Sequence, residues 1–263
     1  MTKTKTNRSA VAATAERLIP SQSRRFYLAV FLLLLLAVVV ARLPTAPEFA
    51  AMPSVVWIDA EVEVQVSLSP SSIIFGGSAD RVDLAPVPAP ATPPKVVTRH
   101  WGGTGFVVDG HLVTARHVVV SEEPTETVKK ITVTTEQGAT ARVEVVREER
   151  ESDLAELKTL DSFKMPSLRL AKTAPKRGDA VTQIGNPAGI RFVTSQGILV
   201  GFDRRQGYNI VAIDTYGGNS GGPDLNAAGE VIGVCHTLIT GSRFTGIGTL
   251  AALRDFLNPD GIR

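Results

Sequence analysis

The sequence has almost no cysteine and few aromatic residues. Cys235 is the one cysteine among 263 residues, so the chain forms no internal disulfide framework and no multi-cysteine metal site. None of the four histidines forms an H-x-x-x-H pair, and we expect neither a metal nor an organic cofactor. The formal net charge of only +2 argues against a nucleic-acid partner. No repeat with a period of about 20–50 residues is present, which excludes solenoids and propellers.

Glycine and proline are abundant, with 23 and 16 residues, whereas aromatic residues make up 6%. This composition favours a β-rich protein with many turns over a helical bundle. Residues 95–258 contain at least nine short β-branched runs separated by Gly and Asp/Asn turns, which predict an all-β antiparallel barrel or sandwich. The stretch LAALRDFL at 250–257 predicts a short C-terminal helix.

An apolar run at 26–41 predicts an N-terminal transmembrane helix, which we assign to residues 26–43. As a helix the run spans roughly 24 Å, slightly less than a bilayer core. The basic tail, 1–25, places the N-terminus in the cytosol and the following domain on the periplasmic or extracellular side. A cleaved signal peptide ending near 39–41 is the alternative and would make the protein secreted. A buried core helix is disfavoured because the run has no polar face.

Residues 44–94 are interpreted as a stem between this segment and the β-rich domain. Their last ten residues, APVPAPATPP at 85–94, have the composition of a semi-rigid extended linker. Earlier in the stem, 55–69 alternates apolar and polar residues in places, which predicts one strand that can dock on the domain. We therefore predict that the folded domain covers 95–258, followed by a short tail at 259–263.

A glycine-rich run, TYGGNSGGP, surrounds Ser220. A serine hydroxyl is a weak nucleophile, so it needs a nearby base and N–H donors for the oxyanion that develops. Flanking glycines allow backbone conformations that expose successive N–H groups. We expect an oxyanion hole over Gly218, Asn219 and Ser220, with the N–H groups of Gly218 and Ser220 as donors.

Two further residues complete a site for acyl transfer. His117 follows a strand-like run, where a general base can be held rigidly. Asp153 opens an alternating run and can orient an imidazole. Taken singly, each of the three has an ordinary interpretation, as a surface histidine, a capping aspartate or an incidental serine. Their order, at separations of 36 and then 67 positions, predicts a catalytic triad.

Six collinear motifs across residues 100–235 resemble trypsin-like peptidases of the Do/HtrA type. The resemblance implies two six-stranded antiparallel β-barrels of the chymotrypsin fold, with His117 and Asp153 from the first and Ser220 from the second. It also implies serine endopeptidase activity on protein or peptide substrates. The motifs are GTGFVV (103–108), LVTARHVV (112–119), SDLAELK (152–158), IGNPAG (184–189), SQGILVG (195–201) and GGNSGGP (217–223).

Some features depart from that family. About forty residues follow Ser220, so we expect neither the PDZ domain of many relatives nor control through it. Asn219 stands where pancreatic-type enzymes carry an aspartate that pairs with a newly cut N-terminus, so activation by that ion pair is not expected. The run TYGGNSG also fits the T-x-x-G-x-S-G signature of sobemovirus-like polyprotein proteases, and a viral enzyme remains an alternative.

Four residues are candidates for substrate binding. Asp214 lies six residues before Ser220, the offset of the acidic residue in trypsins that prefer Arg or Lys, and Thr215 follows it. A turn cap is the alternative role for Asp214. Cys235 holds a place where glutamate-preferring relatives carry a histidine. His236 faces the other way unless a bulge intervenes, so we expect it near the back of the triad, with no catalytic role.

A non-catalytic binding module on a peptidase fold is the alternative from a different functional class. An intact triad argues against it, because binding has no physical need for all three residues. An α/β-hydrolase esterase is excluded by the chain order His, Asp, Ser. Asn186 and Pro187 are interpreted as turn residues. The expected partners are peptide substrates and, through residues 26–43, a membrane.

Overall fold

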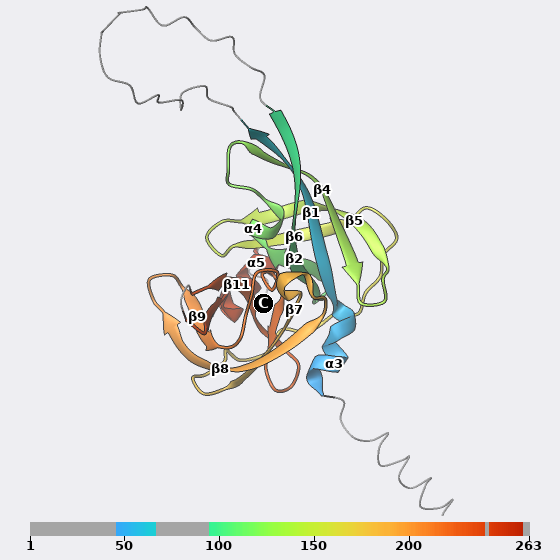
Figure 1. Cartoon of the computed structure of the whole chain (residues 1–263). Coiled ribbons are helices and arrows are strands. Elements are labelled where there is room, and N and C mark those ends of the chain that lie inside the picture. Colours follow the sequence, from blue (N-terminus) through green and yellow to red (C-terminus); the bar gives the residue numbers. More distant parts are fainter. Residues whose placement is uncertain (1–45, 67–94, 240–241, 260–263) are drawn as a thin grey trace, which may run out of the picture. The chain divides into compact units, whose positions relative to one another are not determined.

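The computed structural model describes residues 46–66, 95–239 and 242–259 (Figure 1). The predicted basic tail (1–25) and transmembrane helix (26–43) lie outside these ranges, as does the proline-rich part of the predicted stem (85–94). Within the described ranges, no helix combines the length and the apolar character needed to cross a membrane.

The first barrel consists of six antiparallel strands in the closed order β1-β2-β3-β6-β5-β4. The one-turn helix α4 (Arg116–Val119) follows the third strand directly (Figure 1). The strands are β1 (Val55–Val66), β2 (Lys95–Val108), β3 (His111–Ala115), β4 (Glu126–Thr135), β5 (Thr140–Glu149) and β6 (Leu154–Thr159).

Strand β1 comes from the segment that was predicted to be a stem. It pairs with β2 from Val55 opposite Phe106 to Val66 opposite Lys95, and with β4 on its other side. The compact unit accordingly begins at Ala46 rather than at the predicted residue 95. Without β1 the barrel would open between β2 and β4 and expose two strand edges. The inward side chains alternate with period two and are fully buried at Val56, Ile58, Ala60 and Val62.

The second barrel also has six antiparallel strands, in the closed order β10-β11-β12-β9-β8-β7. The helix α5 (Leu250–Leu257) follows it, and its N-cap Thr249 accepts a 3.1 Å hydrogen bond from the N–H of Ala252. Two six-stranded barrels and the C-terminal helix are therefore confirmed. The strands are β7 (Ala180–Gly185), β8 (Val193–Asp203), β9 (Tyr208–Ala212), β10 (Pro223–Leu225), β11 (Val231–Leu238) and β12 (Phe244–Ile247).

Three short helices complete the described fold. The helix α3 (Pro47–Ala51) and the 3-10 turn η1 (Met52–Ser54) lead into β1 (Figure 1). A second 3-10 turn, η2 (Pro187–Gly189), lies between β7 and β8 and contains Ala188 at a positive φ of 49°.

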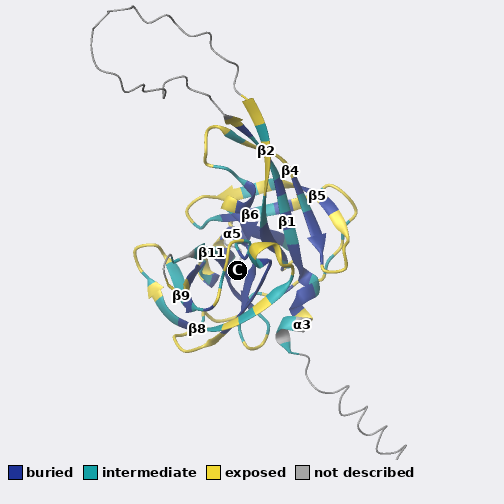
Figure 2. Cartoon of the chain, in the orientation of Figure 1, coloured by how far each residue is buried: buried dark blue, intermediate teal, exposed yellow. Residues whose placement is uncertain are grey.

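One apolar cluster spans both barrels, which fixes their relative position. Val55 and Phe106 of the first barrel share it with Ile184 and Leu225 of the second and with Leu253 of α5. All five side chains are fully buried, and Figure 2 shows buried residues on strands of both barrels, β1 and β11 among them. Burying each such side chain contributes roughly 1.5–3 kcal/mol, so the arrangement of residues from different barrels is rigidly held.

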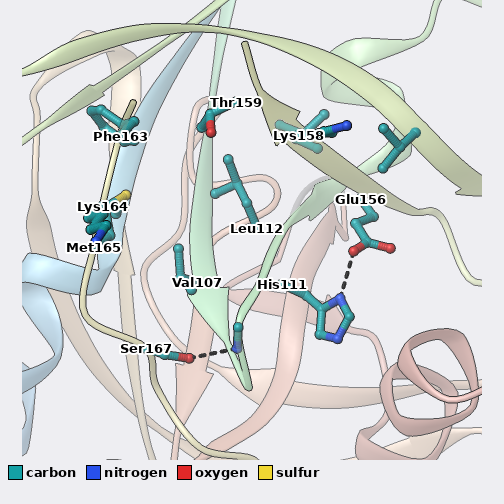
Figure 3. Close-up of a pocket in the computed structure, with 13 residues that line it drawn as sticks. Val107, His111, Leu112, Glu156, Lys158, Thr159, Phe163, Lys164, Met165 and Ser167 are labelled. Carbon is teal, nitrogen blue, oxygen red and sulfur yellow. Dashed lines mark hydrogen bonds and ion pairs between the residues drawn. The ribbon is translucent and has the colours of Figure 1, made fainter. Parts of the chain in front are cut away.

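A hollow of about 500 Å³ lies on the first barrel beside β3 and β6 (Figure 3). On its rim, Nδ1 of His111 lies 2.6 Å from Glu156 Oε1, and Glu156 also accepts a 2.8 Å bond from Arg147. None of the predicted catalytic residues lines it. Its apolar wall includes Val107, Leu112, Phe163 and Met165.

Candidate active site

The antiparallel pairing of β3 and β6 brings His117 and Asp153 together. Ala115, the last residue of β3, lies opposite Leu154, the first residue of β6. Because α4 continues directly from β3, the residue after that strand and the residue before β6 must be neighbours. The N–H of Arg116 donates to the Asp153 carbonyl at 2.9 Å, which ties the two chain segments together before either side chain is considered.

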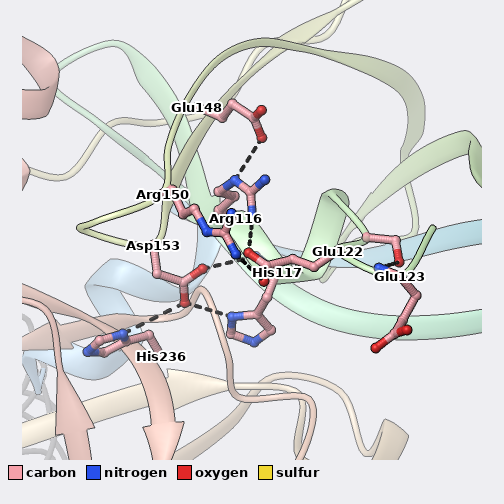
Figure 4. Close-up of polar contacts among 9 residues, drawn as sticks. Arg116, His117, Glu122, Glu123, Glu148, Arg150, Asp153 and His236 are labelled. Carbon is pink, nitrogen blue, oxygen red and sulfur yellow. Dashed lines mark hydrogen bonds and ion pairs between the residues drawn. The ribbon is translucent and has the colours of Figure 1, made fainter. Parts of the chain in front are cut away.

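The Asp153 carboxylate holds His117 at two points (Figure 4). Its Oδ2 lies 2.7 Å from Nδ1 of the imidazole, and its Oδ1 accepts the His117 backbone N–H at 3.0 Å. With Nδ1–H directed at the carboxylate, the neutral ring leaves Nε2 free to accept a proton. Asp153 has a positive φ of 53°, a region that aspartate tolerates better than most residues.

Opposing effects set the pKa of Asp153. Burial raises this pKa, whereas hydrogen bonding to His117, the neighbouring His236 imidazole and the charge of His117 lower it. The lowering effects prevail, and the pKa of Asp153 lies well below its usual range. Asp153 is consequently an anion at neutral pH, as a residue that stabilises an imidazolium must be.

The loop between β9 and β10 carries Ser220 and is pinned to both barrels. The Ser220 carbonyl accepts a 2.8 Å bond from the N–H of Thr104 on β2. Gly221 donates to the Cys235 carbonyl on β11 at 2.7 Å. Gly221 has a φ of +82°, and a Cβ there would overlap the Thr104 carbonyl and the Thr114 hydroxyl. Only glycine allows this approach, which brings the Ser220 loop against β3 just before His117.

The Ser220 hydroxyl itself makes no hydrogen bond within the described part of the chain. The structure thus forms the Asp153–His117 pair and brings the Ser220 loop to it, but the bond between Ser220 and His117 is not formed. Bonds of this kind are often long in unliganded enzymes and tighten when substrate binds.

Two backbone N–H groups of the Ser220 loop are free to receive an oxyanion. Among the described residues, the N–H groups of Gly218 and Ser220 donate to no backbone carbonyl. The Asn219 N–H between them does so, to Tyr216 at 3.1 Å. Of the three residues predicted for the oxyanion hole, Gly218 and Ser220 therefore offer donors and Asn219 does not.

The direction of the Gly218 N–H is set by the loop between β7 and β8. The Gly217 carbonyl accepts a 2.7 Å bond from the N–H of Ala188. In a trans peptide the carbonyl and the following N–H point in opposite directions, so the Gly218 N–H faces away from that loop. A Cβ at Gly218, which has a φ of +101°, would overlap the Asn186 carbonyl. Close packing on η2 thus orients the donor.

Asn186 connects the barrels beneath this loop, a role that its interpretation as a turn residue missed. Its Nδ2 donates to Thr104 Oγ1 at 2.9 Å and to the Val56 carbonyl at 3.3 Å. The Thr104 hydroxyl in turn donates to the Gly218 carbonyl at 2.7 Å. Asn186 is fully buried, and its partners Thr104 and Val56 are 82 and 130 residues away in sequence, so no local signal reveals them.

A buried polar cluster lies behind Asn219. Gln183 donates to Asp224 Oδ1 at 3.0 Å, and its own carbonyl oxygen accepts bonds from Thr215 at 2.7 Å and Asn219 at 3.1 Å. Asp224 is fully buried, and its Oδ2 has no partner among the described residues. Burial raises the pKa of Asp224 to about 7, although the bond from Gln183 opposes this. The Asn219 side chain is thus an internal anchor of the Ser220 loop.

The first two candidate substrate residues line a hollow of about 320 Å³ with Tyr216 and Arg243. Asp214 Oδ1 and Oδ2 accept bonds from Arg243 Nη2 at 3.0 and 3.1 Å. The Asp214 and Arg243 side chains are 59% and 83% exposed. The carboxylate that was predicted to receive a basic substrate side chain is therefore already paired with a cation of the chain itself.

Neither of the other two candidates lines this hollow. Cys235 is buried, and burial followed by the charge of Asp224 raises the pKa of its thiol, so the thiol is unreactive. The register of β11 with β12 shifts between Cys235 and Thr237, which makes His236 the extra residue of a bulge. Its Nδ1 lies 3.7 Å from Asp153 Oδ2, behind the Asp153–His117 pair (Figure 4).

Two closed antiparallel barrels, with a His–Asp pair on the first and a glycine-flanked serine on the second, define the two-barrel class of serine peptidases. Residues 103–234 match the family model of the trypsin-like peptidase domain. The chain belongs to this family, and the resemblance to Do/HtrA-type peptidases is confirmed.

The similar proteins include DegP-like serine endoproteases that are named as periplasmic. The chain is 35% identical over 158 residues to one from Chlamydia trachomatis, covering 56% of this chain and 30% of that protein. It is 29% identical over 245 residues to one from Halomonas elongata, covering 82% and 50%. The chain thus spans at most half the length of these two relatives. A crystal structure of the serine endoprotease from Yersinia pestis has a TM-score of 0.56 at 21% identity, covering 83% of this chain and 67% of that one.

Proposed function

We propose that the protein is a serine endopeptidase of the DegP/HtrA type that cleaves peptide bonds through an acyl-enzyme on Ser220. The observation that carries the proposal is the two-point hold of Asp153 on His117, next to a serine loop with two free N–H groups. This arrangement contains a base, the residue that orients it and donors for an oxyanion, which together are what acyl transfer by a serine requires.

In the reaction, Ser220 Oγ attacks the substrate carbonyl while His117 Nε2 takes the hydroxyl proton. Asp153 keeps Nδ1 protonated and stabilises the imidazolium that forms. The Gly218 and Ser220 N–H groups bind the oxyanion, and one such donor is worth about 2.7–4 kcal/mol in the transition state. His117 then returns the proton to the leaving amine, and water releases the acyl group by the same steps.

The substrates are protein or peptide segments that bind in extended form. The hollow lined by Asp214 and Thr215 lies on the segment that leads to Ser220 and can hold a substrate side chain. A basic side chain would have to displace Arg243 from Asp214, so the preference for Lys or Arg depends on that ion pair. We place the domain outside the cytoplasm, tethered through 26–43, because basic residues precede that segment and the relatives are named as periplasmic.

A catalytically silent binding module is the second candidate. It is favoured by one observation, the lack of a hydrogen bond on the Ser220 hydroxyl within the described residues. In such a module the His117–Asp153 pair would be structural, and the serine would not be activated.

Labelling with a fluorophosphonate separates the two candidates. The full chain, in detergent micelles, is treated with the probe and weighed intact beside Ser220→Ala and Ser167→Ala, the latter removing an exposed serine on the first barrel. We expect one adduct on the wild type and on Ser167→Ala, and none on Ser220→Ala. A folded wild-type chain that takes up no probe would support the silent module instead.

A further inference from the structure

His236 approaches the catalytic carboxylate from the side opposite His117. Its Nδ1 lies 3.7 Å from Asp153 Oδ2, the same oxygen that lies 2.7 Å from Nδ1 of His117 (Figure 4). The distance of 3.7 Å exceeds that of a hydrogen bond. One carboxylate oxygen thus faces two imidazole nitrogens that come from different barrels.

The surroundings of the His236 ring favour one protonation state. The side chain is only 17% exposed, and the ring meets Tyr208 edge-on at 5.3 Å between centroids. Its Nε2 is buried and has no partner among the described residues. An imidazolium would leave a charged N–H unpaired at Nε2, which costs more than leaving a neutral acceptor unpaired. With Nδ1 facing an anion, the neutral form protonated on Nδ1 fits both nitrogens.

We propose that His236 is a positioning residue, a neutral imidazole whose Nδ1–H is directed at Oδ2 of Asp153 and fixes the carboxylate that orients His117. The proposal rests on the proposed function, because it concerns the same His117–Asp153 pair. It assigns His236 no contact with substrate.

A third donor on Asp153, added to the ring and the backbone N–H of His117, has two consequences for His117. It restricts rotation of the carboxylate, which must hold the ring and the backbone N–H of His117 at once. It also shares the negative charge of Asp153, so the carboxylate stabilises the imidazolium form of His117 less strongly than it would alone.

Among the described residues, few titratable groups lie near these two rings. Asp153 faces both rings from the turn before β6, and Tyr208 faces His236 from β9. Arg116, the residue before His117, is directed to Glu122 at 2.8 Å and to Glu148 at 3.0 Å instead.

The first test does not depend on activity. Full-length Ser220→Ala protein with ¹⁵N-labelled histidine is examined by NMR at neutral pH, and the His236 signals are identified by their loss in His236→Leu. We expect Nδ1 of His236 to be protonated and Nε2 to be unprotonated. A proton on Nε2, or on both nitrogens, would overturn the proposal even if the chain proved to have no activity.

The second test compares His236→Leu, which fills the space without a donor, with His236→Asn, whose amide N–H can take the place of Nδ1–H. The rate of fluorophosphonate labelling is measured against pH. In the Leu variant we expect the acid limb to move up by about half a pH unit and the plateau rate to fall several-fold. The Asn variant should keep the wild-type midpoint. If both folded variants lost the same labelling rate and kept the wild-type midpoint of the acid limb, His236 would be a packing residue and the proposal would be wrong.

Discussion

Asn186 Nδ2, at the end of β7 in the second barrel, donates a 2.9 Å hydrogen bond to Thr104 Oγ1, on β2 in the first. Because Thr104 passes a bond on to the Gly218 carbonyl, the shape of the oxyanion loop depends on how the two barrels dock. Stability and activity should therefore respond together when this bridge is broken.

Replacing Thr104 with valine tests the bridge, because the shape is kept and the hydroxyl is lost. Buried Asn186 and the Gly218 carbonyl would each lose a partner, so we expect the free energy of unfolding to fall by about 1–3 kcal/mol. Labelling of Ser220 should slow as well. Chemical denaturation and labelling rates measure both effects. Thr98→Val, at an exposed position of the same strand, is the control, and a similar change there would refute the bridge.

Gly221→Ala should displace the Ser220 loop. The new Cβ would overlap the Thr104 carbonyl and the Thr114 hydroxyl, at a φ of +82° that alanine disfavours. We expect loss of labelling and a lower melting temperature. Gly178→Ala is the matched control, because Gly178 has a similar φ of +95° with nothing within 4 Å. In that variant the free energy of unfolding should fall only by the backbone strain, of the order of 1 kcal/mol, and Ser220 should be labelled normally.

Asp153→Asn should abolish most of the activity. An asparagine amide can present its N–H to Nδ1, which leaves the imidazole in the wrong tautomer, and the analogous change costs about 10⁴ in kcat in a related triad. Hydrolysis of a peptide library by the purified chain measures the effect. Asp161→Asn, at an exposed site on the same barrel, should retain full activity. A loss below about tenfold in Asp153→Asn would contradict the role assigned to Asp153.

Asp224 should make the protein less stable as the pH rises. Its folded-state pKa is about 7 against a reference of 3.8, so the unfolded chain ionises first. Between about pH 4 and 7 the folded state holds a proton that the unfolded state has lost, and ionisation therefore favours unfolding by up to roughly 4 kcal/mol. Asp224→Asn cannot ionise and should lose this decline. The test is to measure the unfolding free energy of the wild type and of Asp224→Asn across that pH range. Parallel curves for the two proteins would contradict the role given to Asp224.

Arg243→Ala should change which peptide bonds are cut. Removing the guanidinium frees the Asp214 carboxylate, so cleavage after Lys or Arg should rise at least tenfold relative to other residues. Asp214→Asn in the same background should cancel the gain. Stability should change by less than about 1 kcal/mol, because both side chains are largely exposed. An unchanged cleavage profile would show that Asp214 lies outside the substrate pocket.

The sequence predicted the parts of the site that depend on local chain geometry. His117 and Asp153 lie beside the ends of two strands that pair directly, and the glycines around Ser220 signal the free N–H groups. The sequence allowed for a bulge at His236 but did not predict one, because the alternation of side chains along a strand cannot reveal a change of register.

For features that depend on distant pairing, the sequence did not reveal the partners. The alternation in β1 was visible, but its place between β2 and β4 rests on partners across a proline-rich segment. Asn186 looked like a turn residue because its partners belong to the other barrel. Asp214 follows β9 and Arg243 precedes β12, 29 residues later in the sequence, so their pairing has no local signal and a free carboxylate was expected there.

The place of β1 also decides how the domain can be separated from the N-terminal segment. Because β1 is hydrogen-bonded to a strand on each side, cutting the connection at 67–94 would leave the N-terminal piece attached to the barrel. Shedding the intact barrels would require a cut upstream of Val55. A cut after β1, within 67–94, would yield two polypeptides that still migrate as one particle.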